Sequence, residues 1–421
     1  MKTGAACFIA LRYLLGRARE GGRYLRGAAA GIALSLIPII VTLIIADGMI
    51  RGITDRFLEL GTGHLRIYDY LDPPAVEGEI PRIAPREGIR GVWPERNGLG
   101  VLVGNQGKAG TTIRAVDPSF LEDEGSSRFL TAVAGEKKLE SDQDVLLGEE
   151  LARSAGAGPG QRIRIMTVRT TPDGRNIPRM TVFTVRGIIS SGYRELDSLW
   201  CIMTYEAGRE ILAPEQSSSY LMVKVDDPYR MSGEAARSLA AELGPAYGIY
   251  TWQELQRSQY SSYESTRQLL LFIMALIVLV AAVNVSSATS MLAIERQRDI
   301  AVLKASGASP ADTSGIFLWS AFLTGLTGAL LGIGLGLCIG NFINPIIRFL
   351  ETVLSFFSRL FRGEGINILD SGYYINTIPI IIDWTAVFLI GLFTVLCSVL
   401  SSWIPARRSG KQRPLELLRK Y

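Results

Sequence analysis

The chain has 421 residues, of which 48% are hydrophobic and 20% are charged, and its mean hydropathy is +0.23. This composition is too apolar for an ordinary soluble enzyme and too charged for a protein that lies entirely within a membrane. It predicts a few membrane spans combined with a sizeable aqueous domain. The single histidine, His64, excludes a metal centre built from several histidines, and the four cysteines do not have metal-ligand spacing.

Four uncharged apolar stretches are long enough to cross a bilayer, which takes about 20 residues. The predicted spans are residues 27–46, 269–294, 313–342 and 384–404. The other segments are a basic N-terminal segment (1–26), a large domain (47–268), a polar connector (295–312), a loop (343–383) and a tail (405–421). We expect the first span to be retained rather than cleaved as a signal peptide, because it is too long and no small-residue cleavage site follows Ala46.

Lysine and arginine gather outside the first and last spans. Six of them precede the first span against the single acid Glu20, and six follow the fourth span against Glu416. Because such residues favour the cytoplasmic side, both termini are predicted to face the cytoplasm, with residues 47–268 on the opposite side. That domain has 26 basic and 31 acidic residues, so the overall charge of +4 comes from its flanks and gives no support for nucleic-acid binding.

The large domain has the pattern of an α+β fold. Alternating apolar and polar residues predict strands within residues 64–70, 161–168 and 180–189, and YLMVKV predicts a further strand at residues 220–225. Residues 233–243 predict an amphipathic helix. The Pro- and Gly-rich stretch 72–100 interrupts the pattern and favours two lobes. The predicted fold class is therefore a multi-pass α-helical membrane protein with four transmembrane helices and a large α+β periplasmic domain between the first two.

No catalytic constellation emerges from the domain. GVLVGNQGKAG has Leu102 where a phosphate loop needs its first glycine, and Ala109 where that loop needs Ser or Thr. The adjacent Glu149 and Glu150 point in different directions on a helix, which favours a solvated face over a pair of catalytic carboxylates. We therefore expect a non-catalytic chain without a bound cofactor or metal.

Two segments suit contacts with partners. In RTTPDGRNIPR, Pro172 and Pro178 stiffen both arms of a loop, which is either a long hairpin tip or a protrusion for a partner. In ERQRDIAVLKASGASPAD, apolar residues at helical spacing end at Gly307, and Ser309-Pro310-Ala311-Asp312 starts a new helix with a capping box. This second segment is either a tight connector or a short helix that a cytosolic protein contacts.

Beyond these patterns, ERQRDIAVLKASGASPADTSGIF, GLTGALLGIGLGLCIGN and WIPARRSGKQRPLELLR resemble the FtsX/MacB-type permeases of ABC transporters. FIALRYLLGR, GHLRIYDY, IPRMTVFTVRGIISSGYRELDS and TWQEL are similar to a closer group, the lipoprotein-releasing permeases LolC and LolE. The resemblance covers essentially the whole chain in the family's order.

The resemblance implies that ATP hydrolysis and membrane transport are carried out by different subunits. A coupling helix at about Glu295 to Ala308 docks into a separate ABC ATPase subunit, LolD-like, which binds ATP and Mg. The matching residues are Glu295, Arg298, Ile300, Leu303, Lys304 and Gly307. The chain itself has no Walker motif, so energy must come from another polypeptide. A second permease chain, identical or paralogous, completes the transmembrane unit in the bacterial inner membrane, and lipoproteins are the substrates.

In LolC-type members, a hook-like loop of the periplasmic domain recruits a soluble lipoprotein carrier, LolA-like. The residues that match this loop are Arg169, Pro172, Asp173, Gly174, Pro178 and Arg179. LolE-type members lack the hook, so the sequence leaves both roles open. Alternatives are a permease of the same superfamily that exports drugs or peptides, or that relays ATP hydrolysis to a periplasmic partner such as a cell-wall hydrolase. A membrane-anchored enzyme or sensor is a third hypothesis, and it lacks a catalytic set.

Overall fold

The computed structural model describes residues 3–15, 22–170, 175–361 and 378–411, and the chain separates into two compact units. The first unit comprises Met1–Met49, Ser262–Leu350 and Ile378–Tyr421, and we call it the membrane unit. The second comprises Ile50–Ser261 and Glu351–Thr377, and we call its main part, residues 50–261, the extramembrane domain.

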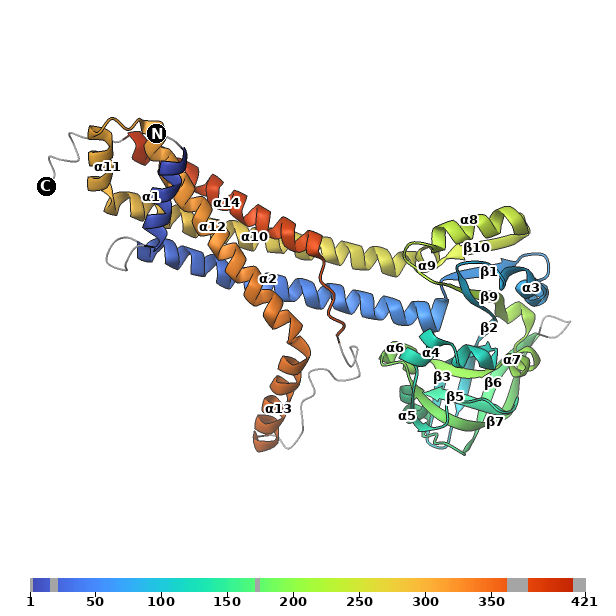
Figure 1. Cartoon of the computed structure of the whole chain (residues 1–421). Helices are drawn as coiled ribbons and strands as arrows, with labels where there is room; N and C mark the ends of the chain where they lie inside the picture. Colours follow the sequence, from blue (N-terminus) through green and yellow to red (C-terminus); the bar gives the residue numbers. More distant parts are fainter. Residues whose placement is uncertain (1–2, 16–21, 171–174, 362–377, 412–421) are drawn as a thin grey trace. The chain divides into compact units, whose positions relative to one another are not determined.

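Among the described residues, four helices are long and apolar enough to cross a membrane. They are α2 (Gly22–Arg56), α10 (Arg257–Glu295), α12 (Pro310–Asn341) and α14 (Trp384–Lys411) (Figure 1). The prediction of four transmembrane helices is therefore confirmed. Helix α2 continues for about ten residues after the predicted span ends at Ala46, and α10 begins about ten residues before the predicted span starts at Leu269. These extensions contain polar residues, so they lie outside the uncharged stretches that predict the spans.

Glycines allow α12 to approach its neighbours closely. A Cβ added at Gly332 would lie 2.8 Å from the Cβ of Leu36 on α2, and one at Gly325 would lie 2.8 Å from the Cβ of Ser398 on α14. Small residues at such contacts let the backbone of one membrane helix approach the side chains of the next. The van der Waals packing that results stabilises helix association in lipid, where a hydrophobic driving force between helices is absent.

Two short helices complete one end of the membrane unit. α1 (Thr3–Leu15) and α11 (Gln297–Ala305) share one apolar cluster with the neighbouring parts of α10, α12 and α14. Gly307 has a φ of +92°, a value that favours glycine, and it ends the α11 segment. Ser309 then caps α12 with a capping box to Asp312. The helix, break and helix predicted for this segment are confirmed.

Within the described residues, the extramembrane domain contains one ten-stranded sheet in the order β10-β1-β9-β2-β3-β8-β5-β7-β4, and β6 pairs with both β2 and β7. The strands are β1 (Leu65–Asp69), β2 (Ile89–Val103), β3 (Lys108–Val116), β4 (Thr131–Gly135), β5 (Asp144–Gly148), β6 (Arg162–Thr170), β7 (Asn176–Ser190), β8 (Trp200–Thr204), β9 (Ser217–Val225) and β10 (Tyr247–Thr251). Because β6 bridges β2 and β7, strands β2, β3, β8, β5, β7 and β6 close into a barrel. The α+β expectation is confirmed.

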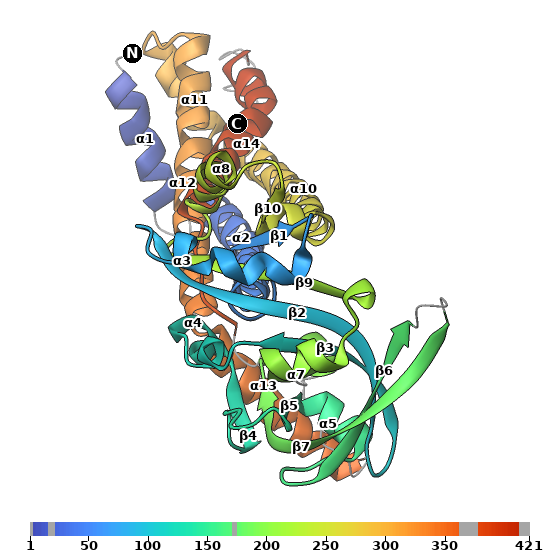
Figure 2. The ribbon, with the colours of Figure 1, turned by 90° about the vertical axis from the view of Figure 1, so that its right-hand side faces the viewer.

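The domain has a separate core at each end of the sheet. Inside the barrel, residues such as Leu147, Ile165 and Val185 are fully buried. At the other end, β1 and β9 pack against α8 (Ser232–Leu243) and α3 (Ile80–Ile83). Strand β2 joins the two ends, because its first half pairs with β9 and its second half pairs with β3 (Figure 2).

One sequence expectation fails in this region. The stretch 72–100 is predicted to interrupt the strand pattern, yet its second part forms most of β2. Gly91, Pro94, Gly98 and Gly100 hide the alternation of the strand, and pairing along both edges holds it extended. The register shifts between Ile89 and Gly91, so one glycine lies at an irregularity of the ladder.

Candidate functional site

The predicted coupling residues do not all lie on one free surface. Ile300 is 2% exposed and packs into the cluster that α1, α12 and α14 share. Glu295, Arg298 and Gly307 are exposed. Leu303 and Lys304 are half-buried, and Ile300 is buried. Ile300 therefore anchors α11 to the rest of the membrane unit, and its side chain is not available to a partner.

The free face of α11 carries Arg298 and Val302, one helical turn apart. Val302 is 57% exposed, and the predicted set of coupling residues did not include it. An exposed valine beside an arginine suits a groove on a partner that is part apolar and part acidic.

Side chains tie α11 to its neighbours at both ends. At its C-terminal end, the Nζ of Lys304 donates to the carbonyl oxygen of Gly410 on α14 at 2.7 Å. At its N-terminal end, Arg296 lies 3.1 Å from Asp299 and 5.1 Å from the ring centroid of Tyr13 on α1. Burial and the neighbouring Asp299 carboxylate raise the pKa of Tyr13 to about 12. A displacement of α11 therefore reaches α1 and α14 directly.

The predicted carrier-recruiting loop is the tip of the β6–β7 hairpin, which extends beyond the barrel (Figure 2). Pro172, Asp173 and Gly174 lie outside the described residues. Arg169 and Pro178 are exposed where the two strands approach the tip, and Val168 pairs with Pro178. Arg179 donates to the carbonyl oxygen of Glu210 at 2.7 Å and to its carboxylate at 2.6 Å.

A groove of about 1020 Å³ lies beside this hairpin, near its outer end. It is formed by the hairpin, by α7 (Tyr205–Ile211) and by the turn that follows α7. Its walls combine arginines, carboxylates and apolar side chains: Arg169, Ile177, Pro178, Arg179, Arg209, Glu210, Ile211, Leu212, Ala213, Pro214 and Glu215. We call it the hairpin groove. Its mixed lining suits a protein surface better than a small anion.

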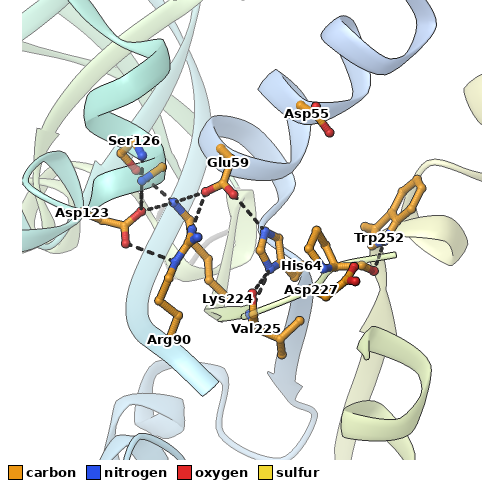
Figure 3. A network of polar contacts seen from close by, with 12 residues as sticks. Asp55, Glu59, His64, Arg90, Asp123, Ser126, Lys224, Val225, Asp227 and Trp252 are labelled. Atoms are coloured by element: carbon orange, nitrogen blue, oxygen red, sulfur yellow. Dashed lines mark hydrogen bonds and ion pairs between the residues drawn. The ribbon is translucent and has the colours of Figure 1, made fainter. Parts of the chain in front are cut away.

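Sequence reasoning missed a buried ion network in the extramembrane domain, which we call the stalk network (Figure 3). Helix α2 continues as a six-residue π-helical segment, Phe57–Thr62, which carries Glu59. Lys224 on β9 has no exposed side-chain surface and lies 3.1 Å from Glu59 and 2.6 Å from Asp123. Arg90 on β2 lies 2.5 Å from Glu59 and 3.5 Å from Asp123.

The charges of the stalk network are mutually compensated. Burial alone would raise the pKa of Asp123, but the hydrogen bond and charge of Lys224 and the charge of Arg90 lower it below its usual value. Burial lowers the pKa of Lys224, and the two carboxylates offset this effect only in part. His64 is fully buried, with Nδ1 at the backbone of Val225 and Nε2 3.4 Å from Glu59.

A second group of contacts, which we call the aromatic clasp, joins the end of α2 to the start of α10. The hydroxyl of Tyr229 donates to Asp55 at 2.7 Å, and the guanidinium of Arg51 lies 3.4 Å from the Tyr229 ring centroid. The indole N–H of Trp252 donates to the carbonyl oxygen of Pro228 at 3.0 Å, and its ring packs edge-on against Tyr229 and Tyr260. The clasp and the network thus fix both connecting helices to the sheet.

Neither group has the chemistry of an active site. Among the described residues, no group of His, Cys, Asp and Glu is arranged to hold a metal ion. Cys201 is fully buried, and burial raises the pKa of its thiol to about 12, so it is not a nucleophile at neutral pH. The described polar clusters hold elements together and present surfaces.

Four spans, a cluster of short helices at one end and a barrel-containing domain inserted after the first span define a multi-pass membrane protein with a large extramembrane domain. Residues 27–241 match the family model of the MacB-like periplasmic core domain, and residues 271–414 match that of the FtsX-like permease C-terminal region. The chain belongs to the family with the MacB-like periplasmic core domain and is a permease of the FtsX/MacB type.

Two relatives resemble the chain over nearly its whole length, and a solved structure resembles it over about half. The lipoprotein-releasing system transmembrane protein LolC of Neisseria meningitidis serogroup B is 27% identical over 98% of each chain, and LolE of Haemophilus influenzae is 24% identical over 98% of each chain. The periplasmic region of MacB from Actinobacillus actinomycetemcomitans is 15% identical, with a TM-score of 0.33, over 48% of this chain and 95% of that one. The predicted resemblance to LolC and LolE is confirmed by the two full-length matches.

Proposed function

We propose that this chain is the transmembrane permease subunit of an ABC transporter that extracts lipoproteins from the bacterial inner membrane and passes them to a periplasmic carrier. The observation that carries the proposal is the full-length similarity to LolC and LolE, whose names describe lipoprotein release. The four spans and the inserted domain supply the two parts such a task needs, one in the membrane and one outside it.

In this proposal the chain is not an enzyme, and a LolD-like ATPase subunit binds ATP and Mg and hydrolyses the nucleotide. The ATPase contacts the exposed face of α11, where Arg298 and Val302 lie. Because Ile300 is buried and Lys304 is bonded to α14, closure of the ATPase displaces several helices together. A second permease chain, identical or paralogous, provides the other half of the transmembrane unit.

The hairpin groove is the proposed contact for the periplasmic lipoprotein carrier, with Arg169, Pro178 and Arg179 at its edge. Its mixed charges and apolar walls match a protein partner. Both termini face the cytoplasm in this arrangement, which follows from the basic residues outside the first and last spans.

The test is reconstitution of the chain with the ATPase of its own transporter, any second permease chain, and a lipoprotein in proteoliposomes. ATP-dependent appearance of the lipoprotein on added soluble carrier is the expected result, and vesicles without ATP are the control. The proposal would be contradicted if ATP is hydrolysed but no lipoprotein appears on the carrier at any carrier concentration.

A second candidate is an exporter of peptides or drugs. It is favoured by the match to the MacB-like core and by the 23% identity to the macrolide export ATP-binding/permease protein MacB of Wolinella succinogenes, over 92% of this chain and 57% of that one. The partner of the extramembrane domain distinguishes the candidates. A lipoprotein carrier supports the first, and a periplasmic adaptor of an export system supports the second.

A further inference from the structure

The segment after α12 is predicted as a loop, but its first part is a helix, α13 (Ile343–Phe361). It begins two residues after α12 ends at Asn341. Up to residue 356, one half of the helix surface carries only apolar residues and the other half only polar ones. The apolar half consists of Ile346, Ile347, Phe349, Leu350, Val353, Leu354 and Phe356; the polar half consists of Arg348, Glu351, Thr352 and Ser355.

Large apolar side chains on this helix are exposed. The exposed fractions are 68% for Phe349, 46% for Leu350 and 41% for Leu354. Contact of so much apolar surface with water is unfavourable, and a contiguous patch of this kind marks an interaction surface. Within the described residues, Phe349, Leu350 and Leu354 therefore keep much of their apolar surface free for a further neighbour.

An ion cluster marks where the membrane unit leaves the hydrocarbon region. Arg267 of α10 lies 3.0 Å from Asp47 of α2 and 2.6 Å from Asp383, which immediately precedes α14. Because charges are costly in the hydrocarbon core, we expect these three charged side chains, at the ends of three spans, to lie outside it. The cluster therefore sets the level of one membrane surface.

The start of α13 is fixed close to that level. The side chain of Asn344 accepts from the backbone N–H of Ile378 at 3.0 Å and donates to its carbonyl oxygen at 2.9 Å. Ile378 is five residues from Asp383, so the chain between them spans at most about 18 Å. The carbonyl of Pro379 also lies directly against Gly48, the neighbour of Asp47 on α2.

We propose that α13 is an interfacial helix, which lies in the membrane surface and places its apolar face at the boundary between lipid headgroups and acyl chains. The helix follows one span and precedes the next, and its first turn is bonded beside the ion cluster, so the lipid surface is the apolar phase within its reach. Phe and Leu on one face and an arginine on the other are the composition of such helices. This inference needs only a membrane-embedded chain and is independent of lipoprotein release.

The test places single cysteines in the full chain after its four native cysteines have been replaced. Leu350→Cys and Leu354→Cys probe the apolar face, and Thr352→Cys and Ser355→Cys probe the polar face of the same helix. Each variant is labelled with an environment-sensitive fluorophore and reconstituted in phosphatidylcholine vesicles with or without brominated acyl chains. Leu330→Cys on α12, a residue 64% exposed within a span, is the lipid control. Arg230→Cys, at a side chain 89% exposed in the extramembrane domain, is the aqueous control.

We expect blue-shifted emission and quenching by brominated lipid at positions 350 and 354, as at position 330. Positions 352 and 355 should instead behave like position 230. Equal quenching at all four positions of α13, or quenching at none, would overturn the proposal. Blue-shifted emission without quenching at 350 and 354 would also overturn it, because protein rather than lipid would then cover the face.

Discussion

At the scale of single residues, Lys224 shows how one side chain depends on the charges around it. It lies in a strand whose last seven residues are all buried, and it is held between Glu59 and Asp123. Its ammonium group also donates to Ser126 at 3.0 Å. Since Glu59 follows α2 and Asp123 caps α4 (Glu124–Phe129), removal of this one charge affects two helices.

Replacement of Lys224 by methionine should destabilise the extramembrane domain by about 3 kcal/mol, because it leaves two carboxylates buried without their cation. Hydrogen–deuterium exchange of the full-length protein should show lost protection in β9 and in α4, which Asp123 caps. Lys108→Met, at an exposed lysine, is the matched control and should change stability by less than about 0.5 kcal/mol. Unchanged protection of β9 in Lys224→Met would refute the role of the network.

The stalk network also predicts a dependence on pH. The pKa of Asp123 in the folded protein is lower than in the unfolded chain, where it is about 3.9. The unfolded state therefore binds its proton first as the pH falls, so the stabilisation is present above the unfolded pKa and is lost progressively as the pH falls through the lower folded pKa. The difference between the melting temperatures of the wild type and of Asp123→Asn should shrink as the pH is lowered from 7 to 3. Parallel curves over this range would contradict the assignment.

At the scale of elements, α11 has one face that packs and one that is free. Val302→Asp places a charge on the free face without disturbing the cluster around Ile300. If the ATPase contacts this face, the substitution should weaken its binding roughly 30-fold, the effect of losing a central contact of about 2 kcal/mol. Co-purification and coupled ATP hydrolysis are the measurements, with Val302→Leu as the control. Leu303→Asp is expected to uncouple transport as well, but Leu303 is half-buried, so its loss also disturbs packing.

The β6–β7 hairpin is the element that we propose to bind the carrier. Arg179→Ala removes an ion pair with Glu210 and a charge from the hairpin groove, and it should weaken carrier binding roughly tenfold, about 1.4 kcal/mol. Replacing Pro172 and Pro178 by alanine should weaken it further by loosening the arms of the loop. Arg230→Ala, far along the chain and exposed, is the control for charge. If all variants bind the carrier equally well, the hairpin does not contact the carrier.

At the scale of the whole molecule, the proposed topology has a direct test. A cysteine at Asp173 should react with an impermeant reagent added from the periplasmic side, whereas one at Glu295 should react only from the cytoplasmic side. The physical reason is that an odd number of spans separates the two positions. Labelling of residue 173 only from the cytoplasmic side and of residue 295 only from the periplasmic side would reverse the assignment, and labelling of both from one side would contradict α10 as a span.

The sequence was sufficient to predict the four spans and the break between α11 and α12. Both depend on local signals, which are the length of an uncharged apolar stretch for a span and the capping residues for a helix start. Such signals were insufficient for β2, whose glycines and Pro94 conceal a strand that neighbours hold in place on both edges. The stalk network is invisible for another reason. Glu59, Asp123 and Lys224 are far apart in the sequence, and only the sheet brings them together. The single clue was a lysine inside the apolar run YLMVKV, which requires a buried partner.

Closure of the barrel has a mechanical consequence for the hairpin. Strands β6 and β7 belong to the barrel and then continue beyond it as the two arms of the hairpin. Residues 164–166 of β6 pair with β2 as well as with β7. Bending the hairpin at its base would therefore require breaking hydrogen bonds of the barrel itself. A carrier bound to the hairpin, as proposed above, would therefore move together with the barrel, because the arms cannot bend independently of it.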